Sequence, residues 1–168
     1  MKGLADLLQT HIDYTAWASA RLVRAASELT SGELRHDFKT ADKSVLGTLV
    51  HVFAADRIWL ARIEGRPPGA FVTEADHQLS VLQNDWPALH DRWKKWAAGI
   101  TEENAQSNIT YTDTSGKTWN QPLWELVLHV VNHGAHHRGQ VSGFLRAMGR
   151  TPPPIDLAVY QREIAAAK

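Results

Sequence analysis

Four of the nine histidines fall within nine positions, at His129, His133, His136 and His137. Imidazole nitrogens are common ligands of divalent transition metals, and residues four apart on a helix bring their Cβ atoms to about 6 Å. His133 and His137 have this spacing, so they could share one ion. On a helical wheel His137 lies in the apolar stripe and His133 about 40° away, whereas His129 and His136 fall on the polar flank. We therefore predict His133 and His137 as an inward-facing metal-binding pair.

A third nitrogen would have to come from another helix. His51 lies in a strongly apolar segment, where a buried histidine needs a polar partner, and it is the predicted third ligand. Three nitrogens leave one position open for water or substrate. His11 also lies on an apolar stripe and could line the pocket or act as a fourth ligand. The alternative for His11 or His51, taken singly, is a core histidine hydrogen-bonded to a carbonyl group.

Other residues are weaker candidates for a role at the predicted metal site. Arg138 and Gln140 follow the histidine pair and are candidates to orient it through hydrogen bonds. Arg57, on an apolar face, is interpreted as half of a structural ion pair rather than an anion site. No general base has a decisive spacing, and four tryptophans are expected in the core rather than over the metal. The candidate bases are His11, Asp13, Tyr14 and Glu125, and the tryptophans are Trp17, Trp59, Trp119 and Trp124.

The elements that must position these residues follow from apolar side chains recurring every three and four positions. This periodicity predicts helices over residues 4–29, 45–64, 79–98 and 122–148. Asp42 or Ser44 would cap the second helix, and Pro87 indicates that the third starts near Asp85 or is kinked. The pattern around Asp113–Gly116 predicts a small β-hairpin, with strands at 108–112 and 117–120.

A short final helix is expected after Asp156, and no internal repeat is present. The predicted fold class is therefore all-α, a four-helix up-down bundle with a small hairpin before the last long helix. The length of 168 residues and the 43% hydrophobic content fit one domain spanning residues 1–168.

Composition excludes several classes of protein. The formal charge is zero, so no overall field attracts nucleic acid or anionic lipid, and neither is expected as a partner. Cysteine is absent, which removes disulfides, thiolate metal sites and a cysteine nucleophile. No segment has the length and apolarity of a signal peptide or a membrane span, so a soluble cytoplasmic protein is expected.

Several of these segments resemble one known family. VNHGAHHRGQ at 131–140 resembles the signature of the DinB superfamily, damage-inducible metal-dependent four-helix proteins related to YfiT-like proteins and thiol-dependent transferases. The segment 47–60, containing His51, is similar to its second helix, and YTAWA at 14–18 to its first. LWEL at 123–126 and the Pro-rich tail also match. The family often has asparagines beside the first-helix tryptophan, where this chain has Thr15 and Ser19.

The resemblance implies a DinB/YfiT-like bundle with a metal held by His51, His133 and His137, and a homodimer. Three imidazoles favour zinc or nickel over magnesium or calcium. The leading hypothesis is a metal-dependent enzyme that activates water or an external low-molecular-weight thiol, as a hydrolase or a thiol-dependent transferase acting on a small-molecule substrate. The alternative is a non-catalytic stress-response protein whose metal is structural.

Overall fold

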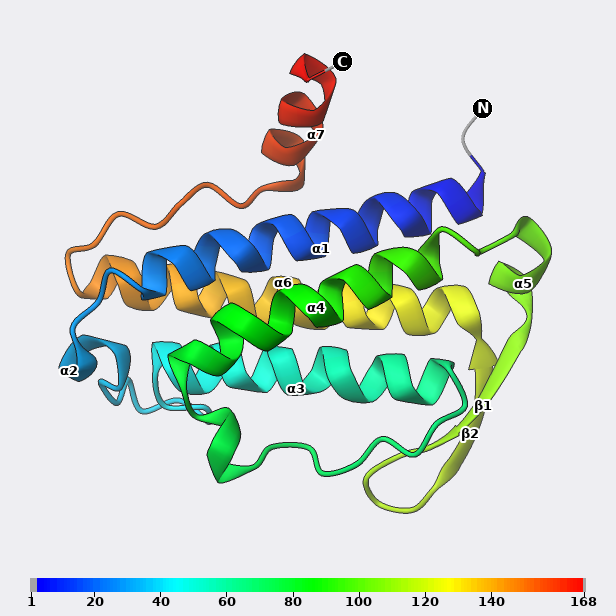
Figure 1. Ribbon diagram of the computed structural model, residues 1–168, viewed down its shortest axis with the longest axis horizontal. Helices are drawn as coiled ribbons and strands as arrows, with labels where there is room; N and C mark the ends of the chain where they lie inside the picture. The colour runs from blue at the N-terminus through cyan, green and yellow to red at the C-terminus, as the bar shows by residue number, and fades with distance from the viewer. Residues whose placement is uncertain (1–2, 168) are drawn as a thin grey trace.

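The computed structural model describes residues 3–167 and is built on four long helices. They are α1 (Leu4–Ala26), α3 (Val45–Ile63), α4 (Leu79–Ala97) and α6 (Leu123–Ala147). The helices pack as a bundle in which α1 and α3 each contact both α4 and α6, so that α1 lies diagonally across from α3 (Figure 1). The predicted all-α four-helix class, with a small sheet before the last long helix, is confirmed.

Successive helices do not simply alternate in direction. Figure 1 shows α3 and α4 running the same way, opposite to α1 and α6. The reason is the long connection 64–78, which returns along the bundle before α4 begins and contains the 3₁₀ helix η1 (Glu74–Asp76). An extended segment of this length easily spans α3, which is about 28 Å long at 1.5 Å per residue. The same segment forms a wall beside the histidine site.

Helix α3 is the most enclosed of the four because apolar residues occur on nearly all its faces. Leu49, Val52 and Leu60 are fully buried. Of the two predicted N-caps the structure uses Ser44, whose hydroxyl accepts a hydrogen bond from the Gly47 amide at 3.1 Å. Buried against α4 and α6, this helix holds its one histidine in a fixed position.

Two short helices were not predicted, α2 (Ser31–Leu34) and α5 (Glu102–Gln106). Each begins after a threonine that exchanges hydrogen bonds with the residue three positions later, Thr30 with Glu33 and Thr101 with Asn104. This capping box is a sequence pattern for a helix start. Helix α4 runs through Pro87 from Leu79, so the alternative start near Asp85 is wrong.

The hairpin pairs β1 (Asn108–Thr112) with β2 (Thr118–Pro122) in antiparallel register. Trp119 is 39% exposed on it, contrary to the expected core position, and its indole N–H donates to the Asp113 carboxylate in the hairpin turn at 2.8 Å. The last helix, α7 (Leu157–Ala166), packs on α1. None of the helices in residues 3–167 is long and apolar enough to cross a membrane.

Candidate metal centre

Three histidines from two adjacent helices meet between α3 and α6. One ring nitrogen from each of His51, His133 and His137 lies within 4.8 Å of the other two. Nε2 of His51 and Nε2 of His133 are 3.0 Å apart, and the His137 ring centroid is 4.4 Å and 4.5 Å from theirs. Two nitrogens that share one tetrahedral ion at 2.0–2.1 Å would stand roughly 3.3 Å apart. The arrangement could therefore hold a divalent transition metal.

The opposite ring nitrogens are held by polar side chains. Nδ1 of His51 lies 3.4 Å from Oδ1 of Asp42, and Nδ1 of His137 lies 3.7 Å from Oδ2 of the same carboxylate. Nδ1 of His137 is also 2.8 Å from Oε1 of Gln140. Because acceptors lie near both Nδ1 atoms, the tautomer protonated at Nδ1 fits these two rings, and it leaves Nε2 as the ligand nitrogen. The role expected for Gln140 fits this geometry, whereas Asp42 was expected only as a possible cap of the second helix.

Burial keeps two of the three imidazoles uncharged. It lowers the pKa of His133 to about 4, with further lowering by the neighbouring His137, His51 and His129. The pKa of His51 is also lowered, mainly by burial, against the opposing effect of Asp42 and with a smaller lowering by His137. Both imidazoles are therefore neutral at neutral pH, which is the protonation state a metal requires. The donor set fits a metal ion.

The loop before α3 places Asp42 by an unusually close approach to the helix. A Cβ on Gly47 would lie 2.0 Å from the backbone oxygen of Asp42, so only glycine permits this contact. Lys39 and Lys43, on either side of Asp42, both adopt left-handed backbone conformations, with φ of 60° and 62°. Such strain in side-chain-bearing residues persists only where surrounding structure enforces it, and it is concentrated at functional sites.

A cavity of about 330 Å³ reaches His51 from the surface. Its walls come from the loop before α3 and from the returning connection, where Phe71 packs edge-on against His51 at 5.3 Å. Arg57 fixes that wall by donating to the carboxylate of Asp76 at 2.9 and 3.1 Å and to the carbonyl of Phe71 at 2.9 Å. The interpretation of Arg57 as a structural ion-pair residue agrees with these contacts.

The remaining histidines of the cluster lie elsewhere. His129 and His136 are exposed on α6, as the helical wheel indicated. His11 lies on α1, diagonally across the bundle from α3, and within residues 3–167 it does not join the group of three. The structure therefore gives no support to His11 as a fourth ligand.

Arg138 does not orient the pair. One residue after His137 it is turned about 100° around α6, where it is fully buried and donates to Ser19 Oγ on α1 at 3.4 Å. The candidate bases also point elsewhere. Tyr14 donates to the Ile155 carbonyl at 2.8 Å, and Glu125 accepts from Gln121 at 3.4 Å.

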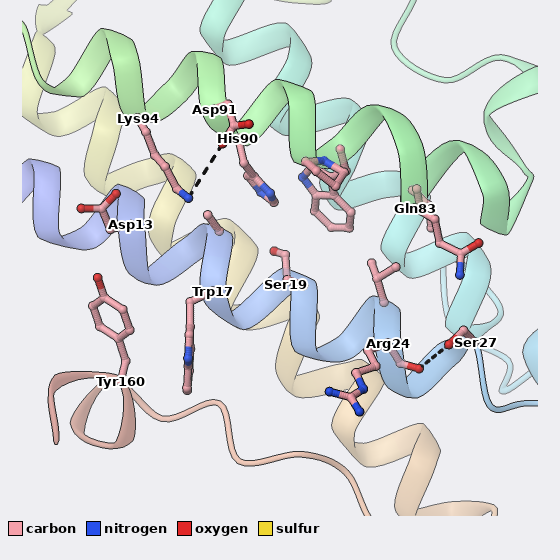
Figure 2. Close-up of a pocket in the computed structure, with 16 residues that line it drawn as sticks. Asp13, Trp17, Ser19, Arg24, Ser27, Gln83, His90, Asp91, Lys94 and Tyr160 are labelled. Atoms are coloured by element: carbon pink, nitrogen blue, oxygen red, sulfur yellow. Dashed lines mark hydrogen bonds and ion pairs between the residues drawn. The ribbon is translucent and has the colours of Figure 1, made fainter. Parts of the chain in front are cut away.

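A second, larger cavity of about 690 Å³ lies between α1 and α4, with Tyr160 of α7 at its edge (Figure 2). Figure 2 shows His90 and Lys94 extending from α4 toward α1, where Asp13 lies near Lys94. Burial raises the pKa of Asp13, and the charge of Lys94 opposes this. None of the three clustered histidines lines this cavity.

Comparison with known proteins agrees with the site. The model of the DinB family matches residues 4–165. The chain is also 22% identical over 165 residues to Protein DinB of Bacillus subtilis (strain 168), a match that covers 94% of this chain and 95% of the relative. Because the family match spans nearly the whole chain, including all three clustered histidines, this protein belongs to the DinB family.

Proposed function

We propose that the protein is a metal-dependent enzyme in which His51, His133 and His137 hold one divalent ion and leave a coordination position open to a small nucleophile. The observation that carries the proposal is the convergence of three imidazoles, and no more than three, in the described residues, with a cavity of about 330 Å³ beside one of them, His51. A purely structural site is normally closed by four protein ligands, whereas a catalytic one keeps three and admits a ligand.

When bound, a transition-metal ion supplies Lewis acidity, which lowers the pKa of a coordinated water or thiol and makes either one a nucleophile. The chain's own residues set the charge at the site, orient the ligands and limit the access of water. Neutral imidazoles leave the charge of the ion uncompensated, and Asp42 and Gln140 fix the ring orientations. Phe71 covers one side of His51 and limits water around it. Since the sequence contains no cysteine, a thiol nucleophile would be an external low-molecular-weight thiol.

The alternative is a non-catalytic, stress-response protein with a structural metal. The Asp42 carboxylate is the nearby group that could close the coordination shell, because it lies 3.4 Å and 3.7 Å from two of the rings. It faces Nδ1 of both rings, however, whereas His51 meets His133 through its other ring nitrogen, Nε2. This favours the enzyme.

A cobalt-substituted protein tests the open position. Addition of 2-mercaptoethanol, cyanide or azide should change the ligand-field bands, and the thiol should add a charge-transfer band, because an open shell exchanges its fourth ligand. A spectrum unchanged at saturating concentrations of all three would mean a closed inner shell and would support the structural alternative.

We further propose that the resident metal is zinc or nickel, since imidazole ligands suit these borderline ions. Elemental analysis of protein purified without a nickel column should give close to one transition-metal ion per chain. Magnesium or calcium alone would contradict the assignment.

The proposal includes a homodimer. It is supported by the resemblance to the DinB family, which implies a homodimer. Light scattering should give twice the mass of the 18.7 kDa chain, and a mass near one chain would refute the dimer.

A further inference from the structure

Arg62, in the last turn of α3, has an unusual environment. It is only 9% exposed, and its guanidinium lies 4.7 Å above the ring of Trp59 and 5.5 Å from that of Tyr111. Burial lowers its pKa, against the effects of Tyr111 and Asp113. Within residues 3–167, Arg62 forms no ion pair, and its buried Nε donates no hydrogen bond. A partly desolvated cation without a counter-anion is costly.

Arginines that do form ion pairs show what Arg62 lacks. Arg57 on the same helix has Asp76 at 2.9 Å, and the more exposed Arg92 has Glu64 at 3.0 Å. The acid whose charge acts on Arg62 is Asp113, but that carboxylate already accepts hydrogen bonds within the hairpin turn and from Trp119. The negative end of the α3 dipole offsets part of the cost and provides no hydrogen bond. Arg62 is therefore available to pair with an anion from outside.

Arg62 is aligned with the histidine site. It follows His51 by eleven residues, or about three helical turns, so the two side chains lie on the same face of α3. Their positions are about 16 Å apart along the helix axis. Aromatic rings fill the interval. The His133 ring is 5.8 Å from His129, which is 4.9 Å from Trp59, whose ring contacts Arg62. His129 is exposed, and His133 and Trp59 are half-buried, so the rings of this row reach the surface between α3 and α6.

We infer that the small molecule bound at the three histidines carries a carboxylate that pairs with Arg62. This carboxylate would lie roughly 10 Å from the ligand atom at the metal, less than the axial separation, because the arginine side chain leans back toward the helix N-terminus. The inference rests on the proposed function. It defines the substrate class as an elongated organic anion whose middle part lies on His129 and Trp59. A carboxylate suits the planar guanidinium because two parallel hydrogen bonds can form.

A series of thiols measures the spacing directly. Cobalt-substituted full-length protein is titrated with ω-mercaptoalkanoic acids and with ω-mercaptoalcohols of matched chain length, and affinity is taken from the thiolate charge-transfer band. Short acids and alcohols should bind equally, and acids long enough to reach Arg62 should bind about tenfold more tightly. Arg62→Gln should remove this advantage and leave the alcohols unchanged.

Arg66→Gln is the matched control, since Arg66 follows the end of α3 and pairs with Glu64 instead. It should keep the advantage of the long acids. Equal affinities at every chain length, or an advantage that survives Arg62→Gln, would overturn the inference while leaving the open metal position intact.

A second measurement does not depend on thiols or on cobalt. The ¹H–¹⁵N resonance of Arg62 Nε, assigned by its loss in Arg62→Gln or Arg62→Lys, should shift saturably when octanoate is added to the zinc protein. If no thiol alters the cobalt spectrum but this resonance shifts, thiol activation is wrong and the anion site stands. An unshifted resonance rejects the anion site whatever the cobalt result.

Discussion

The two cavities of the bundle differ in size and in what they bring together. The one between α1 and α4 has about 690 Å³ and the one beside His51 about 330 Å³. The larger is lined mainly by apolar and small side chains, with its charged groups spread along two helices. The smaller is lined by Asp42 and by His51, one of three imidazoles that converge within 4.8 Å. Convergence of donors, rather than volume, therefore distinguishes the candidate metal site.

The largest expected effect separates the inward from the outward histidines. His137→Ala or His133→Ala should reduce bound metal to well below one ion per chain, because two imidazoles cannot replace three. His136→Ala and His129→Ala remove neighbouring histidines that are exposed and should retain full metal content. Elemental analysis after dialysis makes the comparison, and full metal in His137→Ala would exclude that residue as a ligand.

Asp42→Asn comes next. It keeps the shape of the side chain but loses the charge that holds two rings, so metal affinity should fall about 10–100-fold, the usual cost of losing such an orienting partner. Competition with a chromophoric chelator gives the affinity, and circular dichroism checks that the helices persist. Unchanged affinity would mean that Gln140 and packing alone orient the rings.

Asp76→Asn tests the clamp on the cavity wall. Arg57 holds the pKa of Asp76 at about 2, below its ordinary 3.8. A carboxyl group with a lowered folded pKa stabilises the protein above its unfolded pKa, and this contribution is lost as pH falls from near 4 toward 2. Asp76→Asn should lower the free energy of unfolding at pH 7 by roughly 1–2 kcal/mol. The variant should also lose less stability than the original protein between about pH 4 and pH 2, as thermal melts at each pH can show. Equal acid dependence in both proteins would contradict this.

The smallest effect is expected in the larger cavity. Ala20 is exposed on its α1 wall, and Ala20→Phe should occupy part of the space while changing stability by only about 0.5 kcal/mol. Metal affinity should be unchanged, because α1 and α4 form the side of the bundle opposite α3 and α6. A marked loss of metal would show that the two regions are coupled.

How far the sequence predicts this molecule depends on the range of the interactions. Helical periodicity is local, so the long helices and the inward direction of His133 and His137 follow from it, and the hairpin follows from an equally local turn pattern. His51 could be named because a histidine in a helix apolar on nearly all sides needs a partner. The expectation that Arg138 orients the histidine pair was wrong for an equally local reason. Arg138 is one residue after His137, so the helix turns its side chain toward α1.

The place of Asp42 beside the histidines could not be predicted because Asp42 lies in no periodic element. Its position depends on two left-handed lysines and on the absence of a side chain at Gly47, and a glycine within a helix has several common explanations. The cavity walls depend on how segment 64–78 folds back, which pairs Arg57 with Asp76 nineteen residues later. Contacts between distant segments of this kind leave no spacing pattern in the sequence.

The separation of the clustered histidines along the chain has a consequence for folding. His51 and His133 are 82 positions apart, yet their ring nitrogens lie 3.0 Å from each other. An ion shared by them would close a long loop and restrict the unfolded chain, much as a disulfide does. Since this chain has no cysteine, such a bridge could act as its reversible cross-link. The melting temperature would then rise with free metal concentration, and the cell's metal supply would set the lifetime of the fold.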